Sequence, residues 1–371
     1  MQLFKCSSCN QLVYFDNYYC ESCQHILGFD AKKMQMVALN ALPQMDEVDT
    51  KTQVLVEPNT KQNYKFCYNY QYKVCNWVIE KHSEDVFCQA CVFNRTIPNL
   101  SDDQYRERWH KIELAKHRLI YALLRWNLPK KNRKQNPEDG LAFDFKADPN
   151  CSDKPKVLTG HDNGLITLNI AEADDVERAM ARNQMDEVYR TLLGHFRHEI
   201  GHYYWDILIS NSKYLDECRD LFGDDRLSYQ DALDHYYQHG APVNWMENYI
   251  SAYATMHPWE DWAETWAHYL HIIDVLETAQ SFGMSIKPKV IEDNKLDTEH
   301  FMILDVQLNN PYFAQDFEDI YQAWLPVSFA MNSLNRSMGQ EDFYPFVINA
   351  SVKEKLKFMH RVIQASIQKS T

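Results

Sequence analysis

Two histidines and a glutamate in the segment HFRHEIGHYYWDIL have the types and spacing of a metal site, namely His198, Glu199 and His202. On an α-helix, positions i and i+4 share one face, so both imidazoles can reach one ion. Zinc favours imidazole ligands, and three protein ligands leave a fourth position for water, whose pKa the metal lowers to about 7. Glu199 then lies beside the ion, where it can exchange a proton with this water and a leaving amine. The motif therefore indicates metal-assisted hydrolysis.

A tetrahedral site of this kind needs one more protein ligand, and the segment SAYATMHPWEDWAETWAHYLHII supplies candidates. These are His257, Glu260, Asp261, Glu264 and His268. Pro258 can open a helix on which Glu260 and Glu264 lie one turn apart on one face, while Asp261 points elsewhere. One glutamate can then bind the metal, and the other can fix a histidine ring by accepting its second N–H. The spacing alone leaves open which glutamate takes which role.

The first cysteine cluster consists of two CxxC pairs separated by ten residues, Cys6, Cys9, Cys20 and Cys23. Each pair can form a metal-binding turn, and the four thiolates can surround one zinc ion tetrahedrally. Four sulfur ligands close such a site to water, so we expect a structural zinc rather than a redox centre.

The second cluster has one CxxC pair and one wider spacing within 25 residues, at Cys67, Cys75, Cys88 and Cys91. A second structural zinc is expected there, and free buried cysteines are the alternative. Zinc binding would supply folding energy that the small core of this region cannot supply alone. Cys151 and Cys218 stand apart from both clusters and are expected to be free thiols.

The composition limits the class of protein. The chain has 371 residues, 45% hydrophobic and 13% aromatic, which is ample material for a buried core. Its formal net charge of −14 argues against a general nucleic-acid binder, because phosphate contacts need a basic surface. No window approaches the roughly 20 apolar residues that cross a bilayer, and no secretory signal is evident. We therefore expect a cytoplasmic protein, in which grouped cysteines hold metal because disulfides are disfavoured.

Periodic patterns predict the elements that carry these residues. Apolar residues recur at helical spacing over 101–127, where Asp102 and its neighbours offer an N-cap. Residues 129–153 are polar and aperiodic, which predicts a loop, and alternating runs around the turn at 162–164 predict a hairpin. A helix over 176–209 would contain the two histidines. Further helical patterns occur at 229–239, 259–282, 313–335 and 352–368.

The segments HEIGH and YATMHPWEDWAE together resemble the glutamate zincins, in which an acidic residue follows the ligand glutamate four residues later. The resemblance implies that Glu260 is the third zinc ligand and that Glu264 is the carboxylate that supports the ligands. The lethal-factor-like branch has a tyrosine seven residues before the ligand, which implies that Tyr253 donates a hydrogen bond to the developing oxyanion. A buried core tyrosine is the alternative for Tyr253. Asp261 departs from the aromatic residue that usually follows the ligand.

The whole chain also resembles a bacterial family of zinc-binding metallopeptidases with an N-terminal zinc ribbon. The shared features are the CxxC pair at the start, VCNWVIE, CVFNRTIPNLS, RHEIGHYYWDIL, HPWEDWAETWAHYLHI and FYPFVINASVKEKLKF, which cover nearly the full length. Membership implies the zincin fold and peptidase-like chemistry, and it supplies no substrate.

The sequence therefore predicts an α+β protein with two regions. Residues 1–100 are expected to form a zinc-ribbon region of small β structure with two four-cysteine sites. Residues 101–371 are expected to form a mainly α-helical zincin-like metallopeptidase domain with a small sheet. The expected reaction is hydrolysis of a peptide or protein substrate at one catalytic zinc, with Glu199 as general base. The hairpin at 164–170 would offer an edge strand for an extended substrate.

Two other functions are compatible with the same residues. The ribbons could belong to a non-catalytic module that binds a protein or nucleic acid, with a closed third metal site. A small-molecule amidohydrolase is the second alternative, which a narrow pocket instead of an open cleft would favour.

Overall fold

The computed structural model describes residues 1–41, 54–149, 155–174, 177–178, 191–286 and 310–368. Contacts divide the chain into two compact units, which we describe separately. The N-terminal unit is Leu3–Tyr203, and the C-terminal unit is Tyr204–Thr371 with Met1–Gln2. The division falls within helix α3 (Leu192–Leu208), so this helix contributes residues to both units.

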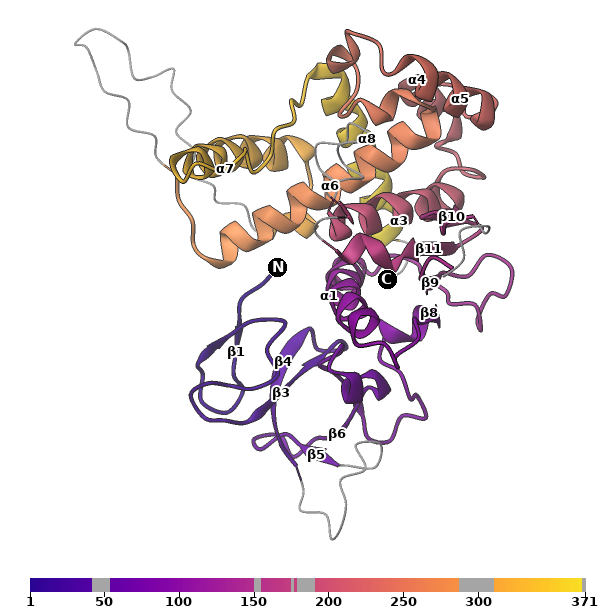
Figure 1. Cartoon of the computed structure of the whole chain (residues 1–371). Coiled ribbons are helices and arrows are strands. Elements are labelled where there is room, and N and C mark those ends of the chain that lie inside the picture. Colours follow the sequence, from indigo (N-terminus) through magenta and orange to yellow (C-terminus); the bar gives the residue numbers. More distant parts are fainter. Residues whose placement is uncertain (42–53, 150–154, 175–176, 179–190, 287–309, 369–371) are drawn as a thin grey trace, which may run out of the picture. The chain divides into compact units, whose positions relative to one another are not determined.

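The N-terminal unit begins with a short hairpin and a closed barrel (Figure 1). The hairpin pairs β1 (Phe4–Lys5) with β2 (Leu12–Val13), and the parallel pairing of β3 with β7 closes the barrel. Its strands are β3 (Ile26–Asp30), β4 (Gln35–Ala41), β5 (Leu55–Val56), β6 (Asn63–Phe66) and β7 (Trp77–Glu80). At Gly28 a Cβ atom would lie 2.4 Å from Val78 Cγ1, so the close approach of β3 and β7 requires glycine. The predicted β character of this region is confirmed, although the barrel was not predicted.

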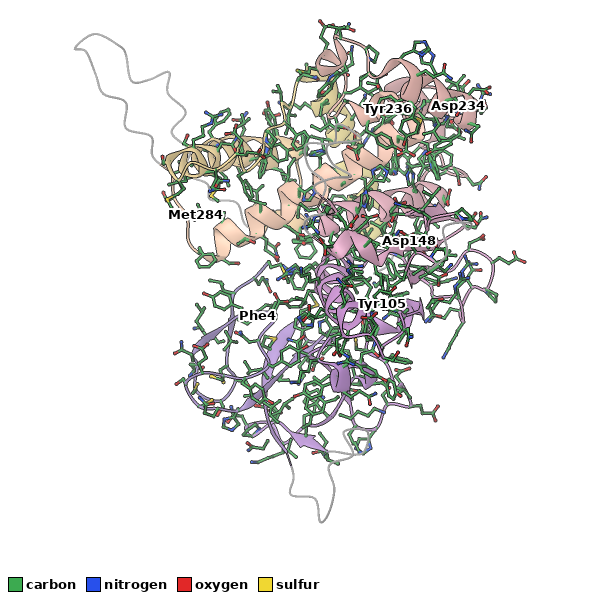
Figure 2. All side chains as sticks on the ribbon, in the orientation of Figure 1. Phe4, Tyr105, Asp148, Asp234, Tyr236 and Met284 are labelled. Carbon is green, nitrogen blue, oxygen red and sulfur yellow. The ribbon has the colours of Figure 1, made fainter. Side chains whose placement is uncertain are left out.

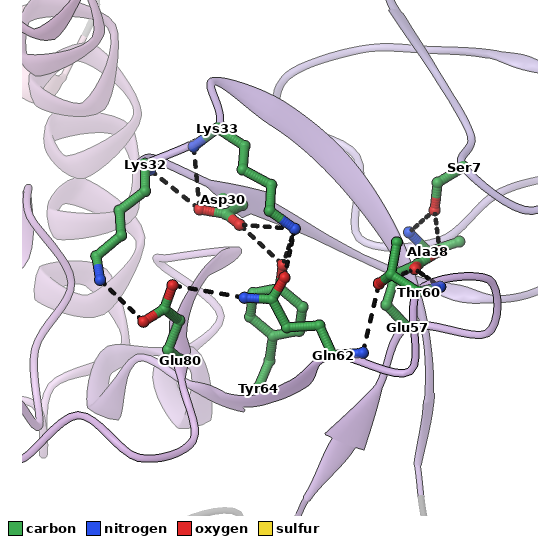
Figure 3. A network of polar contacts seen from close by, with 10 residues as sticks. All are labelled: Ser7, Asp30, Lys32, Lys33, Ala38, Glu57, Thr60, Gln62, Tyr64 and Glu80. Carbon is green, nitrogen blue, oxygen red and sulfur yellow. Dashed lines mark hydrogen bonds and ion pairs between the residues drawn. The ribbon is translucent and has the colours of Figure 1, made fainter.

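A polar network joins the ends of the barrel strands (Figure 3). The buried carboxylate of Asp30 accepts hydrogen bonds from the Tyr64 hydroxyl at 2.8 Å and from the Lys32 backbone N–H at 3.0 Å. Burial, together with Asp30, raises the pKa of Tyr64 above its usual range, so the phenol remains a donor. Lys32, in the turn after β3, also pairs with Glu80 of β7 at 2.9 Å.

A four-stranded sheet follows the barrel, with strand order β10-β11-β9-β8. The strands are β8 (Asn94–Thr96), β9 (Ala142–Lys146), β10 (Gly160–Asp162) and β11 (Leu165–Asn169). Asp162 pairs with Leu165 across the turn, which confirms the predicted hairpin. The hairpin lies at a sheet edge as predicted, and its edge strand is β10, because β11 pairs with β9 on its other side.

The prediction of a loop over 129–153 was wrong, because this range contains the central strand β9. The fully buried Asp144 interrupts the apolar pattern of β9. Its carboxylate accepts from Arg95 Nε at 2.8 Å and pairs with Lys146 Nζ at 2.8 Å. Burial would raise the pKa of Asp144, yet these cations hold it well below its usual range. The paired charge allows a strand that composition alone does not reveal.

The predicted helix over 101–127 is confirmed as α1 (Asp103–Arg125), whose start carries the labelled Tyr105 in Figure 2. Asp102 is the N-cap, and its carboxylate accepts from the backbone N–H groups of Gln104 at 2.9 Å and Tyr105 at 3.3 Å. The buried face of α1 carries charged residues as well as apolar ones, including Glu113 and Lys116. This helix therefore brings charge into the interior of the N-terminal unit.

The C-terminal unit is helical and is built around α6 (Pro258–Ser281), which packs against α4, α7 and α8 (Figure 1). The other α-helices in the described part of this unit are α4 (Leu215–Phe222), α5 (Tyr229–His239), α7 (Phe317–Ser337) and α8 (Ala350–Gln368). The predicted helices at 229–239, 259–282 and 352–368 are confirmed. The helix predicted from 313 begins instead at Phe317, after a 3-10 turn at Pro311–Phe313. In the described part of the chain, no helix is both long and apolar enough to cross a membrane.

A buried ion pair connects α6 to α8. Lys355 Nζ lies 2.6 Å from Asp261 Oδ2 and also donates to the Asn248 carbonyl at 2.8 Å. Burial raises the pKa of Asp261 to about 7, and the Lys355 ammonium opposes this rise. Asp261 thus faces α8, in agreement with the expectation that it points away from Glu260 and Glu264.

Replacing Lys355 by Met should destabilise the C-terminal unit by about 3–5 kcal/mol, because it leaves the Asp261 carboxylate buried without its cation. The free energy of unfolding in denaturant would measure this effect. The matched control is Lys353→Met on the same helix, because Lys353 pairs with Glu318 at a more exposed position. That change should cost no more than about 1 kcal/mol. Equal losses in the two variants would show that the buried pair has no special role.

Candidate metal centres

The first cysteine cluster has the geometry of a zinc site. Cys6 and Cys23 Sγ are 3.6 Å apart, as are Cys9 and Cys20 Sγ. With Zn–S bonds of about 2.3 Å, two thiolates on a tetrahedral zinc lie about 3.8 Å apart, whereas disulfide sulfurs lie about 2.05 Å apart. All four sulfurs lie within 4.8 Å of one another, so these residues fit a zinc ion.

Both CxxC pairs of this cluster end in the same tight turn. Asn10 and Gln24 directly follow the second cysteine of each pair and have φ angles of 63° and 60°. Their backbone N–H groups donate to the Cys6 and Cys20 carbonyls, each at 2.9 Å. The backbone N–H of Gln11 lowers the pKa of the exposed Cys9 to about 7. The turns therefore place the sulfurs, and at Cys9 the backbone also favours thiolate, the form that binds metal.

The fold also brings together the four cysteines of the second cluster, and all four are buried. They are Cys67, Cys75, Cys88 and Cys91. Cys75 and Cys88 Sγ are 3.7 Å apart, which also matches sulfurs on one zinc ion. Backbone N–H groups donate to the sulfurs, including Cys88 to Cys67 at 3.3 Å and Trp77 to Cys75 at 3.4 Å. In contrast, Cys218 is buried outside both clusters, and Cys151 lies outside the described residues.

Charged residues of α1 line the second cluster, a feature that the sequence analysis did not identify. Glu113 Oε2 and His117 Nε2 lie 3.9 Å and 3.8 Å from Cys91 Sγ. Lys116 Nζ lies 2.8 Å from Glu113 Oε2, and both side chains are fully buried. Burial raises the pKa of Cys91, but its cysteine neighbours and the Lys116 ammonium outweigh burial and hold this pKa below its usual value. The ammonium thus offers countercharge to the buried Cys91 thiolate.

His198, Glu199 and His202 lie on α3, and all three side chains are buried. The Nε2 atoms of His198 and His202 are 3.2 Å apart. Two imidazoles on a tetrahedral zinc, with Zn–N bonds of about 2.0–2.1 Å, have nitrogens about 3.3 Å apart. The two ring nitrogens therefore converge as zinc ligands would, and the residues fit this metal.

His161 of the edge strand β10 lies beside this pair, and the sequence analysis missed it. Its ring stacks on that of His202, with centroids 6.1 Å apart and an interplanar angle of 23°. The Gly164 backbone N–H donates to His161 Nε2 at 2.9 Å. Burial, followed by the charge of His202, lowers the pKa of His161 to about 3, so this imidazole is neutral at physiological pH. Strand β10 thus runs next to a candidate metal ligand.

The candidate carboxylates lie in the first turns of α6, in the C-terminal unit. Glu260 is 2% exposed, and its Oε1 accepts a hydrogen bond from the Tyr229 hydroxyl at 2.9 Å. Glu264 is less buried, and its Oε2 accepts from Ser251 Oγ at 2.6 Å. Burial and the charge of Glu260 raise the pKa of Tyr253 far above its usual value, so this phenol stays protonated. Tyr253 therefore has the form of a hydrogen-bond donor.

Comparison with known proteins defines the family. A family model described as "Putative zinc-binding metallo-peptidase" matches residues 105–362, and a zinc-ribbon domain model matches residues 3–102. The chain belongs to this metallopeptidase family. The predicted family resemblance is thereby confirmed. Both cysteine clusters lie within the zinc-ribbon match, and the histidine pair lies within the metallopeptidase match.

Proteins similar to this chain occur in mycobacteria. Uncharacterized proteins of Mycobacterium bovis and Mycobacterium tuberculosis are each 39% identical over 364 residues, which is 98% of this chain and 95% of theirs. No solved structure matches the chain. The two family matches adjoin near residue 103, whereas the contacts group residues 3–203 into one unit. The predicted boundary at residue 100 stays a prediction.

Proposed function

We propose that this chain is a zinc-dependent metalloprotease whose catalytic metal is held by His198, His202 and Glu260. The observation that carries the proposal is the 3.2 Å convergence of the two histidine nitrogens on α3, with Glu199 adjacent in sequence. Glu260 is buried in the first turn of α6 and can supply the carboxylate ligand that the motif resemblance implies. The resemblance to the glutamate zincins and the deeper burial of Glu260 favour it over Glu264 as the ligand.

Zinc at this site would supply Lewis-acid polarisation and a water of lowered pKa. Glu199 then acts as general base toward the attacking water and as general acid toward the leaving amine. The protonated Tyr253 phenol can donate to the oxyanion that develops on the scissile carbonyl. Its raised pKa supports this role, because the hydroxyl keeps its proton at any physiological pH.

The position of β10 supports a peptide substrate. An extended peptide can add to a sheet edge through its backbone groups, which gives affinity without a fixed side-chain sequence. The edge strand β10 carries His161, whose ring stacks on His202. A peptide paired with β10 would therefore lie beside the candidate catalytic metal. We also propose one zinc in each cysteine cluster, which makes one catalytic and two structural ions.

Hydrolysis of peptides with metal removed and restored tests this function. The protein should cleave an unstructured polypeptide, lose this activity with a chelator that spares the cysteine sites, and regain it when zinc is added. Mass spectrometry of the products should show new termini with one added water. Turnover of small amides without any peptide cleavage would favour the amidohydrolase alternative. No hydrolysis of either substrate class by the fully metallated protein would contradict the proposal and favour the binding module.

A further inference from the structure

Tyr229, the first residue of α5, connects this helix to the buried carboxylate of Glu260. The Tyr229 side chain is 37% exposed, whereas Glu260 is 2% exposed. Tyr229 is thus partly exposed to solvent, while its hydroxyl donates to a buried carboxylate. It therefore lies between solvent and the candidate metal ligand. A residue needed only to fill the core would not be this exposed.

His257 fixes the backbone on both sides of this contact. Its Nδ1 accepts from the Trp259 N–H at 3.1 Å, so His257 is the N-cap of α6, three residues before Glu260. The other ring nitrogen, Nε2, therefore carries the proton and donates to the Leu227 carbonyl at 3.1 Å. One side chain thereby connects the start of the helix that carries Glu260 to the segment that carries Tyr229.

Aromatic contacts hold the Tyr229 ring in place. Its centroid lies 5.5 Å from that of His257 and 6.0 Å from that of Trp259. Helix α5 has no buried residue, so its attachment rests on such contacts. A further aromatic contact of α5 comes from Tyr236, which is labelled in Figure 2. Its ring meets that of Tyr253 edge to face, with ring centroids 5.8 Å apart. These contacts hold the Tyr229 ring where its hydroxyl reaches Glu260.

We infer that Tyr229 is a positioning residue of the metal centre, which orients the Glu260 carboxylate by donating to its Oε1. A carboxylate held through one oxygen presents the other in a fixed direction, and partners of this kind strengthen a metal site by about 10–100-fold. The inference rests on the proposed function, because it takes Glu260 as the third ligand. It adds a residue that no sequence motif contains.

Zinc affinity of the Tyr229→Phe variant tests the inference directly. Zinc is titrated against a chromophoric chelator, and a His202→Ala variant identifies the binding event that belongs to the α3 site. Phenylalanine keeps the ring contacts with His257 and Trp259 and removes only the hydroxyl, so the thermal unfolding temperature should change little. Affinity of the α3 site should fall by about 10–100-fold. The matched control is Tyr237→Phe on the same helix, because Tyr237 is 60% exposed. The zinc affinity of this control variant should equal that of wild type.

A double variant separates positioning from general stabilisation. If Tyr229 acts through Glu260, adding Tyr229→Phe to Glu260→Gln should lower zinc affinity no further. Additive losses would instead show that Tyr229 acts independently of Glu260 and would overturn the inference. Wild-type zinc affinity in Tyr229→Phe, with affinity lost in Glu260→Gln, would overturn it while the ligand assignment stands. Full affinity in Glu260→Gln would overturn both the ligand assignment and the role of Tyr229.

Discussion

Replacing Glu199 by Gln should lower peptide hydrolysis by at least about 10²–10⁴-fold, the usual contribution of a general base. The amide is nearly the same size as the carboxylate, but it cannot take a proton from the attacking water. His198 and His202 keep their positions on α3, so zinc should stay bound. Rates of peptide cleavage and zinc content of the same sample would measure the two effects together.

A second carboxylate on α3 provides the control for this variant. Asp206 lies on the same helix after the histidine pair, and Asp206→Asn removes one negative charge in the same way. Hydrolysis should remain near the wild-type rate in that variant. If Glu199→Gln cleaves peptides at the wild-type rate, Glu199 has no part in the chemistry. If it loses zinc as well as activity, its role is to hold the metal and not to move a proton.

Replacing Cys88 by Ser should unfold the barrel region of the N-terminal unit. Structural zinc sites contribute about 10–16 kcal/mol to folding, and a domain is stable by only about 5–15 kcal/mol. Cys88 is buried within the second cluster, and its sulfur also accepts the Cys91 backbone N–H at 3.4 Å. Limited proteolysis and zinc content would measure the loss.

Two other cysteines make this prediction specific. Cys218→Ser changes a thiol that is equally buried but lies outside both clusters, so it should leave zinc content unchanged. We expect it to cost about 1–3 kcal/mol, because the more polar hydroxyl replaces a buried thiol. Cys9→Ser, at the exposed edge of the first cluster, should release one zinc ion. Proteolytic resistance equal to wild type in Cys88→Ser would show that the second cluster does not stabilise the fold.

Local patterns explain why much of the site was predictable. The histidine pair and the first cysteine cluster need only short spacings within one helix or one turn, and these spacings are visible in the sequence. The long helices were predictable for the same reason, because Asp102 and the apolar face of α1 mark one continuous element. Both features depend on neighbours in the chain and hardly on the rest of the fold.

Features that depend on distant contacts were not predictable. Two barrel strands, β5 and β6, have two and four residues, too few for an alternating pattern to stand out. Strand β9 contains Asp144, a residue type that usually indicates a loop. Its burial in a strand depends on Arg95, which is 49 residues away in the sequence. A lysine on a helix is expected at the surface, yet Lys116 of α1 is buried near Cys91. Tyr229 and Glu260 are 31 residues apart, and no motif joins them.

Metal content per chain, measured by mass spectrometry after purification under reducing conditions, tests the central claim most directly. Wild type and Glu264→Gln should each hold three zinc ions, and Glu260→Gln should hold two, because only Glu260 is taken as a ligand of the catalytic metal. Two ions in wild type, unchanged by either substitution, would mean that the histidine pair on α3 retains no metal. That result would contradict the metalloprotease proposal and favour a binding module with structural zinc alone.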